Sequence, residues 1–405
     1  LVTGVLFGVL AIFQMGWISQ FLSKAVITGF LFGAAIEVII GQLRHLTATE
    51  SSGTNAWEKL FSWVGGLSDA HLATLAVGVV SLVVLFGLKV VAPRLPGALI
   101  LLVGALLASA LLGFEAAGIE LVGEVPSGLP AVALPSAEVV SEHLPIVLSA
   151  AVGILLAAFA QGAGGAREYA AKHRYTIDID QESLAHGAAN VGSGLVGGMP
   201  VGASLSATSA NDAAGAKTPL ASLVLGVLVV LTMVFLAPLF SGLAEAVLAA
   251  LIIYAVFGLL NVKEMRRLWR VARADFWIAM LALLGVLGGG VLWGVIVGVM
   301  LSLGWLIYRA ASPRIPVLGR EPGGPFFHPI DEYPDGELFP GLLVLRFEAG
   351  LFFASADALE DRLMELDAAV DYDYNTVVLD MAGVHFIDSQ GASKLGELLD
   401  VAEIY

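Results

Sequence analysis

Cysteine is absent from this sequence, and charged side chains make up only 14% of its 405 residues. Without thiols, the chain can form neither a disulfide framework nor a zinc site with thiolate ligands. So little charge, combined with a hydrophobic content of 58%, lies outside the composition of soluble globular domains. The composition therefore predicts a protein that crosses a lipid bilayer several times.

Basic residues are also scarce: the chain has 20 of them against 35 acidic residues. The excess of negative charge is concentrated near the C-terminal end, where the stretch from Asp331 to Tyr405 holds 17 acidic and 3 basic residues. Nucleic acids and anionic lipid surfaces are bound through clustered Lys and Arg. We therefore predict no nucleic-acid partner and a membrane part that is nearly neutral.

Long apolar runs define the predicted membrane part. A bilayer core about 30 Å thick requires roughly 20 apolar residues per helix. Runs of this kind lie at about 1–17, 24–43, 72–92, 96–114, 144–166, 184–199, 219–238, 240–260, 275–290 and 291–309. The segment 201–215, rich in glycine and serine, is too short and too polar to span alone, but we count it as an eleventh membrane element.

Basic residues predict the orientation, because Lys and Arg in short loops stay on the cytoplasmic side. They follow alternate elements, as at Lys89, Arg167 and Lys217, whereas the loop 115–142 holds five Glu and no Lys or Arg. Arg44 and Lys59 are exceptions to this alternation. An odd number of elements with a cytoplasmic C-terminus places the first residue outside, so we expect further spans to precede it.

The composition changes after the last apolar run. We predict a transmembrane domain over 1–312, a linker rich in proline and glycine over 313–340, and a small α/β domain over 341–405. In that domain "LLVLRF" and "LFFAS" predict strands, "ADALEDRLMELDAAV" a helix, "NTVVLDM" a buried strand and "SQGASKLGELLDVAEIY" another helix. The charge pattern places this domain in the cytoplasm.

The segment "GLVGGMPVGASLSATSANDAAGAKTPL", residues 194–220, has two possible roles. Its small residues suit close packing between helices. A helix that starts within the bilayer near Pro200 would instead present backbone N–H groups and hydroxyls to an anion, since helix N-termini carry partial positive charge. Irregular backbone at membrane depth survives only where it is buried in protein or lines a cavity. The sequence favours the binding role and leaves the packing role open.

Three motifs resemble one family. "HRYTIDIDQESLAHGAANVGSGLVGGMPVGASLSATSANDAAGAKTPLASL" and "SKAVITGFLFGAAIEVIIGQL" are similar to segments of the sulfate permease (SulP) or solute carrier family 26 transporters. "VVLDMAGVHFIDSQGASKL" resembles the STAS domain that these transporters carry at their C-terminus. The resemblance covers essentially the whole chain. It implies a bacterial-type anion transporter in the inner (plasma) membrane.

The resemblance also implies an architecture and a site. Members have fourteen membrane segments in two inverted repeats of seven, and bind their substrate between two half-helices, the third and the tenth. This chain would begin at the fourth segment, and "PVGASLS" would start the tenth. The substrate-binding residues implied in this way are Gly202, Ala203, Ser204, Leu205, Ser206, Ala207 and, on the eighth segment, Gln161.

Two departures from the family pattern bear on coupling. Ala207 stands where many exchangers have an arginine, and Gln161 stands where a carboxylate is expected. Without an internal cation or a carboxylate for sodium, we expect proton symport of a carboxylate or dicarboxylate such as fumarate, or of bicarbonate or sulfate. Glu37 is a coupling candidate because an ionisable group within an apolar helix is costly, although a solvated position near a helix end would also explain it.

Two further residues have a structural and a functional interpretation. His186 is more typical of a wetted interface residue than of a proton relay. Ser389 precedes a helix and is either its N-cap or a regulatory phosphorylation site, as in related bacterial domains. The cap is the favoured interpretation.

The predicted function is therefore secondary transport of small anions by alternating access, with no metal or other cofactor and with a possible homodimer. One alternative is a non-transporting sensor or motor whose STAS domain carries the output. A nucleobase carrier of the same fold is another, but it would need acidic residues that positions 161 and 201–208 do not supply. An enzyme is not expected, because no cluster of nucleophile, acid and base is evident.

Overall fold

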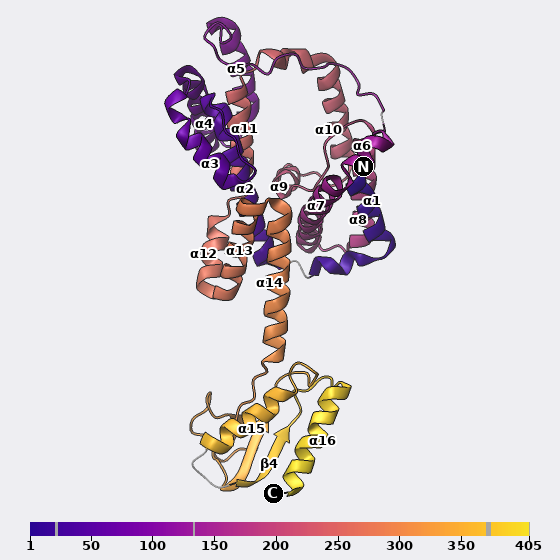
Figure 1. Cartoon of the computed structure of the whole chain (residues 1–405), viewed down its shortest axis with the longest axis vertical. Helices are drawn as coiled ribbons and strands as arrows, with labels where there is room; N and C mark the ends of the chain where they lie inside the picture. The colour runs from indigo at the N-terminus through magenta and orange to yellow at the C-terminus, as the bar shows by residue number, and fades with distance from the viewer. Residues whose placement is uncertain (21–22, 133, 370–373, 405) are drawn as a thin grey trace. The chain divides into compact units, whose positions relative to one another are not determined.

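The computed structural model describes residues 1–20, 23–132, 134–369 and 374–404. By its internal contacts the chain divides into unit 1, Leu1–Ser302, and unit 2, Leu303–Tyr405. Figure 1 shows that unit 1 is helical and that the named strands lie in unit 2. Each unit is treated by itself below.

The helices of unit 1 follow the apolar runs closely. They are α1 (Val2–Ile12), α2 (Lys24–Thr47), α3 (Ala56–Gly65), α4 (Leu72–Val91), α5 (Gly97–Leu112), α6 (Ala137–Glu142), α7 (Leu144–His173), α8 (Ile179–Leu195), α9 (Leu205–Ala213), α10 (Leu220–Leu231), α11 (Glu245–Phe257), α12 (Val262–Val271), α13 (Arg273–Gly289) and α14 (Val291–Ala311), the last of which crosses the boundary between the units. Short 3-10 helices cover Met15–Gln20, Leu67–Asp69 and Ala237–Gly242, and a π-helical turn covers Thr232–Leu236.

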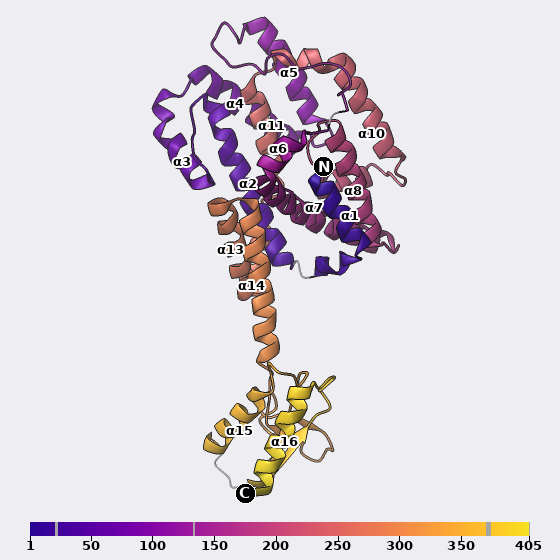
Figure 2. The ribbon, with the colours of Figure 1, turned by 45° about the vertical axis from the view of Figure 1, so that its right-hand side comes forward.

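Two helix groups build unit 1. In one, α2 packs against α13, α11 and α4; in the other, α1 packs against α8 and α7 (Figure 2). Glycine permits a close approach in the first group: a Cβ atom on Gly29 of α2 would clash with the backbone of Ala279 on α13, and one on Gly33 would lie 2.9 Å from the carbonyl oxygen of Leu283. Phe7 of α1, which is 1% exposed, packs with Ala158 and Phe159 of α7 in the second group.

Six helical stretches of the described chain are long and apolar enough to cross a membrane. They are Lys24–Thr47, Leu72–Val91, Leu144–His173, Leu220–Gly242, Glu245–Val271 and Leu292–Ala311. The predicted runs at 1–17, 96–114, 184–199 and 275–290 form helices of 11, 16, 17 and 17 residues. None of the residues of α10 is buried within the described chain. Helices α3 and α12 lie in segments that were predicted as loops.

Unit 2 is a small α/β fold. Strand β3 (Gly341–Arg346) pairs in parallel with β4 (Tyr374–Asp380), and the two are connected through helix α15 (Asp357–Ala369), with α16 (Ser389–Ile404) following. Leu343, Leu345 and Leu359 are fully buried and form its core. The helices predicted for "ADALEDRLMELDAAV" and "SQGASKLGELLDVAEIY" are thereby confirmed as α15 and α16 within the described residues.

Two predictions for unit 2 are wrong. "LFFAS" is a turn, not a strand, because the Ser355 hydroxyl donates to the Gly350 carbonyl oxygen at 2.8 Å and accepts from the Phe352 amide at 3.1 Å. Strand β4 is mostly exposed and not buried, with Val378 43% exposed, because β3 is its only partner in the described sheet.

The segment predicted as a linker has local structure. Strands β1 (Leu318–Arg320) and β2 (Phe327–Pro329) form an antiparallel pair within it. Ile315 and Leu318 are buried, and Ile315 belongs to the core of unit 2. Proline and glycine therefore mark tight turns here, while the apolar residues between them pack. The predicted domain boundaries stay predictions.

Candidate functional site

The extended segment 199–203 is held against α8 by two polar side chains of that helix. Ser193 Oγ donates a hydrogen bond of 2.6 Å to the Met199 carbonyl oxygen. Asn190, which is 2% exposed, accepts from the Val201 amide at 2.9 Å and donates to the Val201 carbonyl oxygen at 2.8 Å. Neither residue was predicted from the sequence. Their spacing of three on one helix before a glycine turn was the available signal.

The same segment also contacts α7 through its small residues. A Cβ atom on Gly202 would lie 3.3 Å from the Cβ of Ala158. One turn along α7, a Cβ atom on Gly162 would lie 3.8 Å from the Cβ of Ala203 and 3.2 Å from Cε1 of His186. Larger side chains at Gly162 or Gly202 would push the segment away from α7. The segment thus combines close packing with irregular backbone.

Helix α9 begins inside unit 1, at Leu205. Ser204 is its N-cap, with φ −130° and ψ 110°, and its hydroxyl accepts from the Ala207 amide at 3.3 Å. The start predicted near Pro200 is wrong by about five residues, because Asn190 engages both backbone groups of Val201 and keeps that stretch extended. The Thr208 amide donates to the Ser204 carbonyl oxygen, which leaves the N–H groups of Leu205 and Ser206 without an acceptor in the helix.

The N-terminus of α9 lacks a fixed negative charge. Its first turn contains no acidic residue, and its cap is a neutral hydroxyl. Ala207, where the family often has arginine, is exposed and contributes no charge of either sign. The side chains of Leu205 and Ser206 lie outside the part of the structure that is described. The partial positive charge of this helix end is therefore available to an anion.

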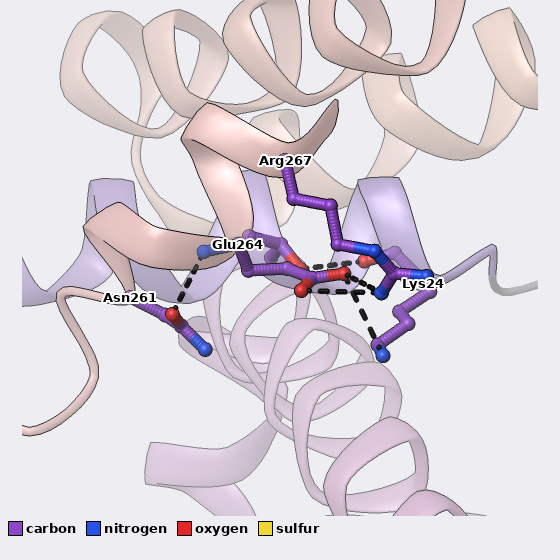
Figure 3. Close-up of polar contacts among 5 residues, drawn as sticks. Lys24, Asn261, Glu264 and Arg267 are labelled. Atoms are coloured by element: carbon purple, nitrogen blue, oxygen red, sulfur yellow. Dashed lines mark hydrogen bonds and ion pairs between the residues drawn. The ribbon is translucent and has the colours of Figure 1, made fainter. Parts of the chain in front are cut away.

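Gln161 lines a cavity of about 570 Å³ on the neighbouring face of α7. Thr28 and Leu31 of α2 lie along the same cavity, and its charged groups are two cations, Lys24 and Arg167, and two carboxylates, Glu168 and Glu264. Figure 3 shows Glu264 between two cations: its Oε1 lies 3.5 Å from Lys24 Nζ and 3.1 Å from Nη1 of Arg267 on α12. Asn261 caps α12 by accepting from the Glu264 amide at 3.0 Å.

The structure brings together only part of the predicted site. Among the residues whose side chains are described, Gly202, Ala203, Ser204 and Ala207 do not line the cavity of Gln161. Gln161 and the α9 start lie on adjacent faces of one stretch of α7, separated by Gly162. Glu37 lies mid-way along α2, is half-buried and does not line this cavity; its charged neighbour is Lys59 of α3.

His186 is built into the contact between three helices. Its ring stacks on Phe7 of α1 with a centroid distance of 5.4 Å and lies against Gly162 of α7. Its Nδ1 donates to the Glu182 carbonyl oxygen at 2.9 Å, which directs Nε2 towards α7. Packing against Phe7 and Gly162 is a sufficient structural reason for an aromatic ring at position 186. A role as proton relay stays a prediction.

The far end of α9 is fixed to α7 by charge. Asp212 lies 2.5 Å from Lys172 Nζ and 2.6 Å from His173 Nε2. Both ends of the short helix are therefore held by residues from longer neighbours: the C-terminal end by this cluster, and the segment before the N-terminal end by Asn190 and Ser193.

The N-cap of α16 is Asp388, and not Ser389 as predicted. Asp388 accepts from the Gly391 amide at 2.8 Å and from the Phe353 amide at 3.0 Å. These backbone hydrogen bonds hold the pKa of Asp388 below its ordinary value. Ser389 is exposed at the first helical position. Its phosphorylation stays a prediction, and a phosphate there would lie beside an ionised carboxylate. Within the described residues, no group of three or more His, Cys, Asp and Glu could hold a metal ion.

Comparison with known families identifies the chain. The sulfate permease family matches residues 1–282, and the STAS domain matches residues 333–403. The chain belongs to the sulfate permease family. It is 36% identical over 351 residues to a probable sulfate transporter of Mycobacterium tuberculosis (strain CDC 1551 / Oshkosh), covering 87% of this chain and 62% of that protein. It is 31% identical over 414 residues to the chloroplastic sulfate transporter 4.1 of Arabidopsis thaliana, covering 98% and 60%.

Solved structures show the same fold. Murine Solute Carrier 26 family member A9, described as an anion transporter in the inward-facing state, superimposes with a TM-score of 0.87 at 24% identity, covering 99% of this chain and 66% of that one. The transmembrane domain of the cyanobacterial bicarbonate transporter BicA gives a TM-score of 0.63 at 20% identity, covering 75% of each chain. The chain spans about three fifths of the length of the curated relatives. The predicted family and fold class are confirmed.

Proposed function

We propose that this sulfate permease family protein is a secondary transporter of small anions, and that the anion binds at the N-terminus of α9. The observation that carries the proposal is the start of α9 itself. The helix begins within the domain, after an extended segment, and the N–H groups of Leu205 and Ser206 have no helical acceptor. The Ser204 cap is neutral, so the helix end attracts an anion and contains none of its own.

The substrate class follows from this chemistry and from the relatives. Two backbone amides without a helical acceptor, together with short hydroxyls, can donate hydrogen bonds to many oxyanions, among them sulfate, bicarbonate and a dicarboxylate such as fumarate. The relatives in Mycobacterium and Arabidopsis that are named as sulfate transporters favour sulfate. The cavity of Gln161, with Lys24 and Arg167 in its lining, would be the route by which the anion reaches α7 and α9.

Protons are the proposed coupling ion. Ala207 provides no fixed cation at the helix start, and Gln161 provides no carboxylate for sodium. Moving an uncompensated anion out of water carries a large desolvation cost, which a proton on the substrate or on an acidic group such as Glu37 would reduce. The proposed location is a bacterial plasma membrane with the STAS domain in the cytoplasm, and a homodimer is the proposed assembly.

Uptake by the full-length protein in liposomes tests these statements together. A panel of labelled sulfate, bicarbonate and fumarate, with proton and sodium gradients imposed separately, should give uptake that rises when the outside is acidic and ignores sodium. Uptake that follows sodium and ignores pH would overturn the coupling. The absence of uptake for every anion in every gradient would favour a sensor over a transporter.

A further inference from the structure

Asn190 is a buried amide that connects α8 to the segment before α9. Its side chain makes three hydrogen bonds: Nδ2 donates to the His186 carbonyl oxygen at 2.9 Å and to the Val201 carbonyl oxygen at 2.8 Å, and Oδ1 accepts from the Val201 amide at 2.9 Å. Only 2% of the residue is exposed. In a sheet, the backbone groups of an extended segment bind to another backbone. Here the backbone groups of Val201 bind to a side chain.

The partners fix how the amide is oriented. Two carbonyl oxygens face Nδ2 and one N–H faces Oδ1, so a rotated amide would oppose donor to donor and acceptor to acceptor. Both N–H donors of the side chain are used. A hydroxyl or a carboxylate at this position could not satisfy all three backbone groups. The site is therefore specific for asparagine, which packing alone would not require.

The three residues 201, 202 and 203 are held one after another. Asn190 holds Val201, Gly202 lies against Ala158, and Ala203 lies against Gly162. Ser204, the cap of α9, is the next residue. The position of the first turn of α9 therefore depends on how the extended segment is held against α8.

We propose that Asn190 is a positioning residue for anion binding, which fixes Val201 so that the N–H groups in the first turn of α9 that lack a helical acceptor are oriented for the substrate. The inference rests on the proposed function of the α9 N-terminus. Without Asn190, Val201 loses both partners, and the first turn of α9 has to be ordered when the anion binds. The apparent affinity then falls in proportion to the fraction of competent protein.

Asn190→Ala tests the positioning role through the split between KM and kcat. Loss of two ordinary hydrogen bonds to the segment corresponds to an increase in KM of about tenfold, with kcat changed by less than about twofold. A merely structural role would lower the amount of active protein, and so the maximal rate, at constant KM. The assay uses the anion that gives the highest uptake in the panel of sulfate, bicarbonate and fumarate.

Ser183→Ala is the matched control. Ser183 lies on the same helix, is also 2% exposed, and donates at 2.7 Å to the Ile179 carbonyl oxygen within α8, away from the segment. The substitution removes one hydrogen bond within α8 and leaves the contacts of Val201 unchanged. The KM of this variant should equal that of the unchanged protein.

Amide hydrogen exchange provides a readout that does not depend on transport. Exchange over residues 199–204 should accelerate in Asn190→Ala and stay unchanged in Ser183→Ala, since the Val201 amide donates to Asn190. Unchanged exchange in Asn190→Ala would overturn the positioning role, even if no anion is transported. Faster exchange with an unaltered KM in a transporting protein would overturn it as well, and would leave the proposed function standing.

Discussion

Two helix N-termini in this molecule differ in what occupies them. The start of α16 in unit 2 is capped by the carboxylate of Asp388, which accepts from the Gly391 and Phe353 amides. The start of α9 in unit 1 is capped by the neutral hydroxyl of Ser204 and has no acidic residue in its first turn. The helix α8 resembles α16, since Asp178 caps it and accepts from the Asp180 amide at 2.8 Å.

A carboxylate cap and a neutral cap leave a helix end with different net charge. A carboxylate at the N-cap compensates the partial charge of the helix permanently, so nothing is left for a mobile anion. A serine satisfies one amide and adds no charge. A neutral serine, Ser23, also caps α2, whose first turn has no acidic residue and begins with Lys24. For α9 we propose that the substrate supplies the compensating negative charge.

The sharpest test of this comparison places a carboxylate at α9. Ser204→Asp should lower anion uptake at least about a hundredfold, because a fixed charge within about 4 Å of the site opposes the substrate by several kcal/mol at an effective dielectric constant near 20. The fold should be retained, since Asp caps helices as well as Ser does. Uptake at equal protein amount measures the effect, and Asp388→Ser, the reverse exchange at α16, should leave it unchanged.

A smaller effect is expected from adding a cation. Ala207→Arg places a positive charge in the first turn of α9 and should tighten binding of the unprotonated anion by about tenfold. Uptake should then depend less on an acidic outside pH, and exchange of one anion for another should increase. Counterflow assays at several outside pH values measure both changes. A variant with the pH dependence of the unchanged protein would argue against charge compensation by a proton.

The smallest effect is expected at α16. The pKa of Asp388 is lowered mainly by the hydrogen bond from the Gly391 amide, so its contribution to stability is present above the ordinary Asp value of about 4 and is lost as the pH falls through the lower folded value. Asp388→Asn keeps the cap and loses the charge. It should lower the unfolding temperature by a few degrees at neutral pH and weaken the decrease in stability at acidic pH, with uptake unaffected.

The helices were predictable because their signal is local. Apolar runs of sufficient length located α2, α4, α7 and α14, and the glycine and serine content located the short element that became α9. The start of α9 could not be placed from local sequence. Pro200 is a suitable first-turn residue, but the backbone there is taken by Asn190, eleven positions earlier on another helix.

The same limit applies to the other corrections. Asp388 and Ser389 are both suitable N-cap residues. Asp388 takes this position because its carboxylate also accepts a hydrogen bond from the Phe353 amide, 35 residues earlier in the chain. "LFFAS" has the composition of a strand, yet Ser355 closes a turn around it. The resemblance to the family located Gln161 and 202–207, whereas the cavity that Gln161 lines depends on α2 and α12, which no motif connects to α7.

Locating a bound anion tests the central claim most directly. Selenate, an analogue of sulfate with an anomalous scattering signal, can be soaked into crystals of the protein in lipid. The account predicts an anomalous peak at the first turn of α9 that places selenate oxygens within hydrogen-bonding distance of the amides of Leu205 and Ser206, and its loss in Ser204→Asp. A peak that lies only in the cavity of Gln161, beside Lys24 and Arg167, or one that persists at α9 in Ser204→Asp, would contradict the account.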